Sequence, residues 1–386
     1  MRRLTLLLAR GLLAAIGVFG LLSLAGCPDE GGDPVEVFPK LYVLNQGDGT
    51  MFILNAKTLE RVDSVNLGAA NPHFIEFSPD GQHYYVVSRT LAGMVSKFQT
   101  SDNAPVGSYT TPFDFQPTAI AITPNGLTGY VVNFGGVDIS TRTKILKLDL
   151  TTMTLIPTNM TAGAMTHDAR CTADGKLVVV CNMMSNDVTI IHTDADTITT
   201  ISIDPDSLYP TPTTKFGPYG VCIDNGSESL LKHGDGGPRA FIACQHGGQV
   251  RVVDLEDFHV TDSLHVPGGH GGSHDLAHGP TQMCYDRNTD HLFVTTQFDN
   301  LVYAVHVEEA GHDHDEETSW EIPLAATQPF GVVISDDGQR VYVACVNAQE
   351  KGWVYMIDNF AHPPAKVDSA QVGKMCYGLA WQPARE

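Results

Sequence analysis

The chain has 386 residues, 42% of them hydrophobic and 17% charged, with 37 glycines and 22 prolines. A long chain with few charges and many turn-forming residues is typical of a folded protein. Its 23 Lys and Arg against 44 Asp and Glu give a formal charge of −21. Binding a phosphate backbone requires clustered Lys and Arg, and the sequence has no such cluster, so we expect no nucleic-acid binding.

The N-terminus has the pattern of a secretory signal peptide. Arg2 and Arg3 precede an apolar stretch that runs from Gly11 and ends in Leu24-Ala25-Gly26-Cys27. This tetrapeptide resembles the lipobox of bacterial lipoproteins. The resemblance implies a signal peptide over residues 1–26, lipidation of Cys27 and membrane anchoring in the cell envelope of a bacterium.

An uncleaved anchor helix is the alternative to cleavage before Cys27. Arg10 interrupts the apolar run, however, and a membrane span needs about 20 apolar residues. Residues 27–40 are rich in Pro, Gly and acidic side chains and are predicted to form a flexible tether. Pro28, rather than Asp, follows the cysteine, which by the custom of lipoproteins implies the outer membrane, facing the periplasm or the cell surface.

A repeat begins after residue 70. Each copy opens with a run of alternating apolar residues, continues through an Asp-Gly- or Asn-Gly-type turn and resumes with a run such as Tyr-Val-x-Asn. The openings are Pro72, Pro117, His167, Pro218, Thr281 and Pro329. Period-two alternation broken by Gly, Asn, Asp and Pro is typical of antiparallel strands joined by tight turns.

Two further runs complete each copy, so each contains four short strands. Residues 41–68 supply the last three strands of a unit that lacks its first, and residues 376–381 resemble a lone first strand. We therefore expect an all-β fold over residues 41–386, a seven-bladed β-propeller of four-stranded antiparallel blades closed by pairing of the N- and C-terminal strands. No segment shows the 3.6-residue periodicity that a helical solenoid of similar repeat length would need.

The Tyr-Val-x-Asn run after a Ser-Pro-Asp-Gly-type turn resembles the YVTN family of seven-bladed β-propellers. The match extends over residues 41–386 and is strongest in the copies that open at Pro72, Pro117 and Pro329. That family includes binding and scaffold proteins of the bacterial envelope, lactonase-like enzymes and domains of redox proteins. The resemblance therefore implies the fold and leaves the function open.

With Cys27 lipidated, seven cysteines remain: Cys171, Cys181, Cys222, Cys244, Cys284, Cys345 and Cys376. An odd number cannot pair fully within one chain, and none belongs to a Cys-x-x-Cys motif. We expect buried, unpaired thiols that pack as small hydrophobic residues, in preference to a disulfide framework.

In a propeller, the start of each first strand and the loop after each second strand lie at one mouth of the central channel. Here the first set is His73, Thr118, His167, Tyr219, Gln282, Phe330 and Tyr377, and the second is Gln46, Arg89, Phe134, Met183, His246, Phe298 and Asn347. The Gly- and His-rich segment 268–278 connects two blades on the same face. Six histidines could therefore converge there and bind Zn or Cu, namely His73, His167, His246, His270, His274 and His278. The alternative is that segment 268–278 is a polar connection only.

A second metal site is predicted at the opposite face. Two loops of adjacent blades carry His233, Asp235, His312 and His314, and imidazoles beside carboxylates are suited to a divalent cation. The alternative is an acidic, solvated loop.

Signatures of catalysis are sparse. The sequence has no Gly-x-Ser-x-Gly motif of an activated serine. A lactonase would need acid, base and cationic groups in the channel, and the candidates are His73, Glu76, Arg89, His167, Asp168 and Arg170. The alternative is that they are ordinary polar residues of the mouth.

The interpretation we favour from the sequence is a lipid-anchored, monomeric propeller that binds a ligand or protein partner on its top face without catalysis. A zinc- or copper-binding or -carrying propeller is the alternative. A lactonase-like hydrolase is the third reading.

Overall fold

The computed structural model describes residues 37–135, 141–204, 216–225, 237–266, 279–297, 300–307, 319–325, 328–347 and 350–384. Phe38–Glu386 forms one compact unit. In these ranges every regular element is a β-strand. The described residues include no helix that is long and apolar enough to cross a membrane.

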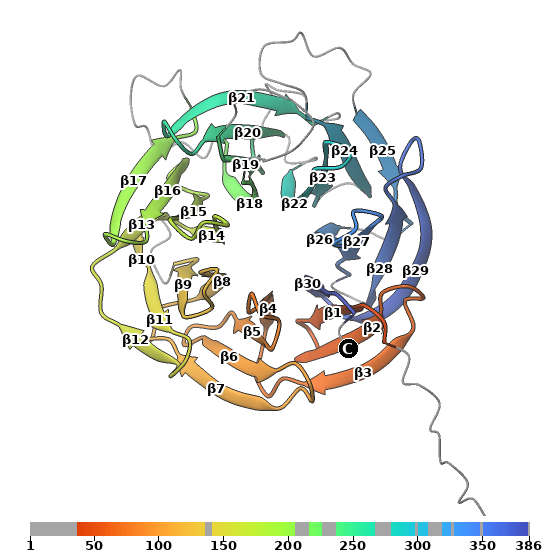
Figure 1. The fold of residues 1–386 in the computed structure, drawn as a ribbon, viewed down its shortest axis with the longest axis horizontal. Helices are drawn as coiled ribbons and strands as arrows, with labels where there is room; N and C mark the ends of the chain where they lie inside the picture. Colours follow the sequence, from red (N-terminus) through yellow and green to blue (C-terminus); the bar gives the residue numbers. More distant parts are fainter. Residues whose placement is uncertain are drawn as a thin grey trace, which may run out of the picture. The chain divides into compact units, whose positions relative to one another are not determined.

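Seven four-stranded antiparallel sheets are arranged in a ring as the blades of a propeller (Figure 1). From inner to outer strand, blade 1 consists of β30 (Cys376–Gln382), β1 (Lys40–Asn45), β2 (Thr50–Asn55) and β3 (Arg61–Asn66); blade 2 of β4 (Pro72–Phe77), β5 (His83–Ser88), β6 (Met94–Gln99) and β7 (Pro105–Thr110); blade 3 of β8 (Pro117–Ile122), β9 (Thr128–Asn133), β11 (Leu146–Asp149) and β12 (Thr154–Ile156). Blade 4 consists of β14 (Thr166–Cys171), β15 (Leu177–Asn182), β16 (Asp187–His192) and β17 (Thr197–Ser202); blade 5 of β18 (Pro218–Asp224), β19 (Arg239–Cys244), β20 (Gln249–Asp254) and β21 (His259–His265). Blade 6 consists of β22 (Pro280–Asp286), β23 (His291–Thr296), β24 (Leu301–His306) and β25 (Ser319–Pro323); blade 7 of β26 (Pro329–Ile334), β27 (Arg340–Cys345), β28 (Lys351–Asp358) and β29 (Ala365–Lys374). The predicted fold class is confirmed.

The turn between the first two strands explains why the repeat is visible in the sequence. In four blades a hydroxyl side chain donates a hydrogen bond to a carboxylate or amide oxygen two residues later. The pairs are Ser78–Asp80 at 2.6 Å, Thr123–Asn125 at 2.7 Å, Thr172–Asp174 at 2.7 Å and Ser335–Asp337 at 2.6 Å. The next residue is a glycine with positive φ, as at Gly81 (φ 62°), because a tight turn needs a left-handed backbone there.

Pairing of the two chain ends closes the ring. β1 is antiparallel to β30, with Tyr42 opposite Ala380, and the Tyr42 hydroxyl donates to Gln382 Oε1 at 3.0 Å. The Asn45 side-chain oxygen accepts the backbone N–H of Gly373 at 2.9 Å. Blade 1 therefore depends on residues from both ends of the chain, as the sequence predicted, and its inner edge is paired.

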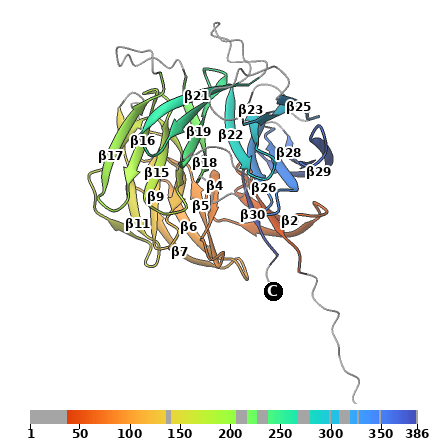
Figure 2. The same cartoon turned by 45° about the horizontal axis from the view of Figure 1, so that its top comes forward.

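The hydrophobic core lies between neighbouring blades. One cluster joins Tyr85 and Val87 of blade 2 to Ile120 and Val131 of blade 3, and equivalent clusters join other pairs of blades around the ring. Figure 2 shows the sheets packed side by side around the ring. A two-stranded sheet, β10 (Arg142–Lys144) with β13 (Thr161–Ala164), is added between blades 3 and 4. The seven cysteines predicted to be unpaired are free thiols, five buried and two half-buried.

Candidate functional site

His73 and His167 meet at the centre of the ring. They occupy equivalent positions near the starts of β4 and β14, two inner strands with β8 between them, and their ring centroids are 5.5 Å apart. The side chains of β8 at this level are small, with Thr118 and Ala119 fully buried. Because β8 contributes little bulk, the side chains of blades 2 and 4 contact each other directly. We call His73 and His167 the upper pair.

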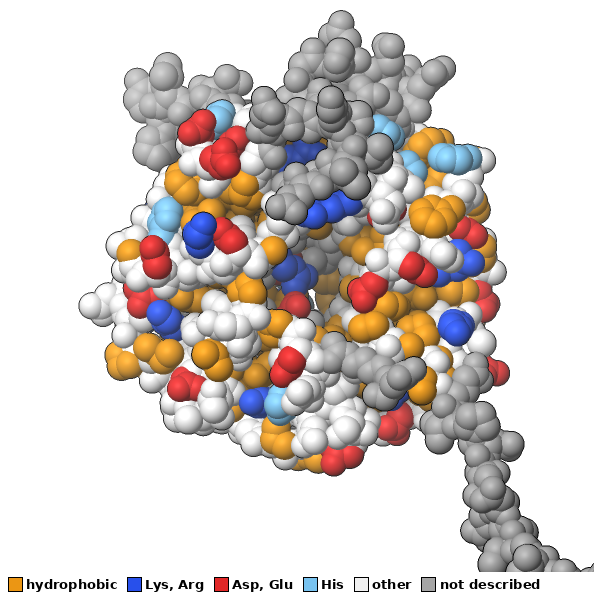
Figure 3. Space-filling model, in the orientation of Figure 1, with side chains coloured by type: hydrophobic (Ala, Val, Ile, Leu, Met, Phe, Trp, Pro, Cys, Tyr) orange, Lys and Arg blue, Asp and Glu red, His pale blue; other side chains and the backbone are white. Residues whose placement is uncertain are grey.

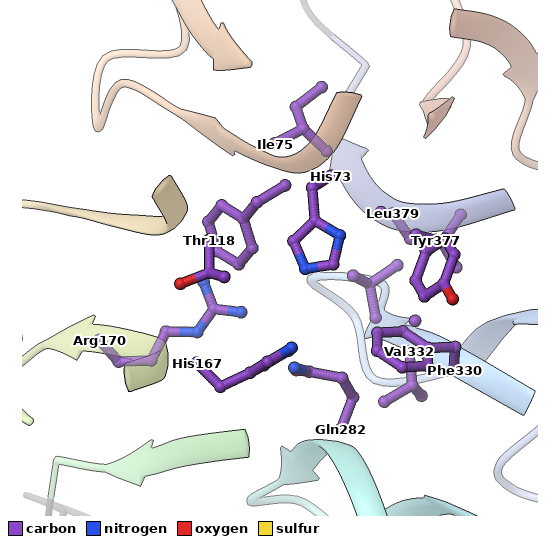
Figure 4. A pocket seen from close by; sticks show the side chains of 14 residues that line it. His73, Ile75, Thr118, His167, Arg170, Gln282, Phe330, Val332, Tyr377 and Leu379 are labelled. Atoms are coloured by element: carbon purple, nitrogen blue, oxygen red, sulfur yellow. The ribbon is translucent and has the colours of Figure 1, made fainter. Parts of the chain in front are cut away.

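A local irregularity directs both imidazoles inward. The register of β4 against β5 shifts between Pro72 and Phe74, and that of β14 against β15 shifts between Thr166 and Ala169. A bulge of this kind changes the direction in which a side chain leaves its strand. In Figure 4, the rings of His73 and His167 both point into the same pocket.

His73 is almost completely buried, with 6% of its surface exposed. With the Gln46 side-chain amide donating to Nδ1 over 3.2 Å, a neutral ring carries its proton on Nε2. Burial lowers the pKa of His73 from 6.5 to about 3, and the nearby Arg89 guanidinium contributes to the lowering. The ring is therefore neutral at physiological pH.

His167 is 3% exposed and stacks on Tyr219, with ring centroids 3.6 Å apart. Neither ring nitrogen makes a hydrogen bond of good geometry with a described residue. Burial holds the pKa of His167 well below 6.5, with His73 and Arg89 adding to the lowering and the Tyr219 backbone opposing it. A buried polar group is usually hydrogen-bonded, so this unpartnered imidazole indicates a place for water or a ligand.

The pocket between the two imidazoles has a volume of about 40 Å³. Polar groups from four inner strands line it, namely His73, Thr118, His167, Arg170 and Gln282. Figure 4 shows the side-chain amide of Gln282 pointing toward the edge of the His167 ring. A buried water needs at least about 10–15 Å³ of such space, so the pocket holds a few waters, and a larger ligand must extend out of it.

Below the upper pair, Glu76 and Arg170 form a second contact between the same two strands. Arg170 Nη1 lies 2.7 Å from Glu76 Oε2, and each side chain is about one-third exposed because it lines the channel. Burial raises the pKa of Glu76, the Asp168 carboxylate adds to the effect and Arg170 opposes it. Asp168 itself is buried and accepts the backbone N–H of Val221 at 3.2 Å. We call Glu76 and Arg170 the lower pair.

Aromatic rings surround the upper pair. Phe330 lies 4.5 Å from Tyr377 and 5.9 Å from Tyr219, measured between centroids, and Tyr377 lies 5.4 Å from His73. The guanidinium of Arg89 stacks 3.7 Å above the ring of Phe134. Figure 3 shows one end of the ring, hollowed at its centre, with basic and acidic side chains around the hollow.

The sequence analysis placed Gln282 at the position equivalent to Tyr377, but the structure places Thr281 there. A Cβ built on Gly331 would lie 2.3 Å from the Tyr377 carbonyl oxygen, and one on Gly220 would lie 2.0 Å from that of Thr281. Thr281 therefore holds the position equivalent to Tyr377, and Gln282 follows it. The sequence correctly placed Phe330 and Tyr377 at this mouth but did not indicate Val332 and Leu379, which extend the apolar wall that β26 and β30 give the pocket.

The predicted rim metal site is only partly described. His73 and His167 lie together, whereas His270, His274 and His278 fall outside the described residues. His246 lies two residues after β19, near Gly217. No group of three or more His, Cys, Asp or Glu that could hold a metal ion occurs in the described ranges. His233, Asp235, His312 and His314 of the second predicted site, and Cys27, also lie outside those ranges, so all these assignments stay predictions.

Comparison with protein families shows which family the chain belongs to. A model of the family described as lactonase, 7-bladed β-propeller, matches residues 50–361. The chain belongs to this lactonase family. A comparison with curated protein sequences found no match.

Solved structures agree on the fold. The periplasmic gluconolactonase of Pseudomonas aeruginosa superposes with a TM-score of 0.67 at 15% identity, covering 90% of this chain and 99% of that one. A protein of Bacteroides uniformis, whose name assigns it provisionally to the 6-phosphogluconolactonases, gives 0.65 at 15% identity and covers 90% and 100%. Hydrazine synthase of Kuenenia stuttgartiensis gives 0.57 at 16% identity and covers 80% and 88%. At such identities, the likeness shows the fold alone.

The family assignment corrects the function that we favoured from the sequence. We expected a non-catalytic binding propeller, and that expectation was wrong, because the family to which the chain belongs is one of lactonases. The absence of an activated-serine motif does not argue against this reaction. Ester hydrolysis by a water molecule needs a base and a polarising donor rather than a nucleophilic side chain.

Proposed function

We propose that the lactonase-family propeller hydrolyses a lactone, with its ester group held against the upper pair. The observation that carries the proposal is the buried imidazole of His167, which has no hydrogen-bond partner among the described residues and lies 5.5 Å from a second neutral imidazole at the wall of a polar pocket. Membership of the lactonase family supports the reaction type. The pocket supplies the space for the attacking water.

The proposed chemistry divides two roles between the imidazoles. His167 accepts a proton from a pocket water as the water oxygen attacks the lactone carbonyl carbon. The Nε2–H of His73 donates a hydrogen bond to the carbonyl oxygen as negative charge develops on it. The Gln46 amide keeps His73 in that tautomer, because it donates to Nδ1.

Collapse of the tetrahedral intermediate breaks the bond between the acyl carbon and the ring oxygen. The proton held by His167 passes to the departing ring oxygen, which becomes a hydroxyl group. The overall step consumes one water and yields one hydroxy acid, which ionises to a carboxylate. In this proposal, Gln282 orients the water, because its side-chain amide points toward the His167 ring (Figure 4).

The test is the rate of hydrolysis of five- and six-membered sugar lactones, followed by acid release at constant pH. We expect His167→Gln to lower kcat/KM by about 10²–10⁴-fold, the usual contribution of a general base. His192→Gln is the matched control, since His192 lies on β16, away from the inner strands, and bonds Thr199 over 2.9 Å. Hydrolysis of no lactone above the uncatalysed rate, or an unchanged rate in His167→Gln, would reject the proposal.

We also propose that the protein is a YVTN-type lipoprotein of the bacterial envelope, anchored through Cys27. The proposal is supported by the charged N-terminal residues, the apolar run and the tetrapeptide that ends at Cys27. Mass spectrometry of membrane-extracted protein should find a diacylglyceryl group on an N-terminal Cys27. A different mature N-terminus would contradict it, as would unchanged membrane retention of Cys27→Ser.

A further inference from the structure

Arg89, at the mouth of the channel, is a cation that has no ionic partner among the described residues. It directly follows β5, and its backbone N–H donates to the Asn71 carbonyl at 2.9 Å. The side chain is half-buried and lies flat on Phe134, 3.7 Å from the ring centroid. No carboxylate among the described residues forms an ion pair with this guanidinium. The N–H groups of its planar guanidinium can therefore donate hydrogen bonds to a ligand.

The groups around Arg89 are neutral and have free polar atoms. The Phe134 ring is 6.2 Å from His167, whose two ring nitrogens are unpartnered at 3% exposure. Tyr219 stacks on His167, and Tyr377 packs beside His73. Neither tyrosine hydroxyl has a hydrogen-bond partner in the described part of the chain. Burial raises the pKa of both phenols, so they are protonated donors at neutral pH.

A partly desolvated guanidinium that lacks a counter-ion is costly unless an anion binds it. Acidic residues are plentiful in the chain, whose overall charge is −21, yet none of the described ones pairs with Arg89. Two observations thus point to one ligand: the unpaired cation and the unpartnered His167 imidazole.

We propose that Arg89, with the free polar atoms of His167, Tyr219 and Tyr377, forms a binding site for a small hydroxy acid, held through its carboxylate. The identity of the occupant rests on the proposed function, because hydrolysis of a neutral lactone creates a carboxylate at the carbonyl carbon beside the upper pair. The site therefore captures the product, and the reaction is subject to product inhibition.

The charge balance favours a monoanionic carboxylate over a phosphate group. Arg170 also lines the pocket, but its charge is paired with Glu76, which leaves Arg89 as the guanidinium available to an anion among the described residues of the site. The fork of a guanidinium matches the two oxygens of a carboxylate. A phosphate monoester carries close to two negative charges at pH 7 and would be left half-neutralised. We therefore expect non-phosphorylated sugar acids to bind better than inorganic phosphate.

The test is calorimetric titration of the full protein with sodium gluconate, with gluconamide and inorganic phosphate as probes that lack the carboxylate. We expect gluconate to bind, gluconamide and phosphate to bind at least tenfold more weakly, and Arg89→Gln to weaken gluconate binding at least tenfold. Arg89→Lys keeps the charge but loses the forked guanidinium, so its affinity for gluconate should lie between those of the parent and Arg89→Gln. Arg61→Gln is the matched control, because Arg61 stacks on Phe52 at 4.7 Å on an outer strand.

Thermal melting of each variant establishes that it is folded before it is titrated. Equal gluconate binding by folded Arg89→Gln and the parent would overturn the proposal, and so would phosphate binding as tight as that of gluconate. Gluconate binding that depends on Arg89 in a protein that hydrolyses no lactone would support the site and reject the proposed function. Lactone hydrolysis by a protein that does not bind gluconate would support the proposed function and reject the product site.

Discussion

At the scale of single residues, the site depends on imidazoles that burial keeps neutral. His73 and His167 lie at the centre of the ring with 6% and 3% of their surfaces exposed. A proton added to either would be desolvated and would lie near the Arg89 guanidinium. Neutral imidazoles can accept or donate a proton at neutral pH, whereas two imidazolium ions 5.5 Å apart would repel each other.

The lowered pKa of His73 predicts a pH dependence of stability. Unfolded His73 binds a proton below about pH 6.5, whereas the folded protein does not bind it until about pH 3. The free energy of unfolding should therefore fall as the pH drops through this window, by up to about 1.4 kcal/mol per pH unit from this residue. In His73→Gln, denaturant unfolding between pH 6 and pH 4 should show a pH slope smaller by that amount. Parallel slopes for the two proteins would contradict the prediction.

At the scale of strands, the starts of the blades could be predicted and the contacts between blades could not. Prolines begin five of the seven inner strands, and Ser/Thr-x-Asp/Asn-Gly turns follow four of the seven. The contact of His73 with His167 depends on the width of the channel and on the small side chains of β8, which no local pattern encodes. Gln282 was assigned one residue too far along because β22 opens at Pro280, as other inner strands open at a proline, and not at Thr281. Periodicity determines strands, but side-chain convergence is a property of the closed ring.

Close approach of inner strands gives a prediction at this scale. A Cβ on Gly331 of β26 would lie 2.3 Å from the Tyr377 carbonyl oxygen of β30, so the two strands must separate to admit it. We expect Gly331→Ala to lower the free energy of unfolding by about 1–3 kcal/mol. Gly107→Ala is the control, because the atom that its Cβ would meet belongs to the Met153 side chain and not to a backbone. Equal thermal stability of Gly331→Ala and the parent would show that the strands are not fixed at this spacing.

At the scale of the whole molecule, pairing of the two chain ends closes the ring. Deleting residues from Lys374 onward removes β30, which is the inner strand of blade 1 and carries buried residues such as Cys376. We expect aggregation, or a loss of at least roughly 2–5 kcal/mol, the usual cost of one large buried truncation. Thermal unfolding monitored by circular dichroism tests this. Cooperative melting at the parental temperature would refute closure by the two ends.

The central claim is that a buried, neutral His167 in a lactonase-family propeller is the general base. The most direct test is kcat for lactone hydrolysis between pH 7.5 and pH 5.5, corrected for the uncatalysed reaction. Because the pKa of His167 lies well below 6.5, kcat should change by less than about twofold over this range. A decline of about tenfold with a midpoint near pH 6.5 would reveal an ordinary, solvated histidine as the base and contradict the account.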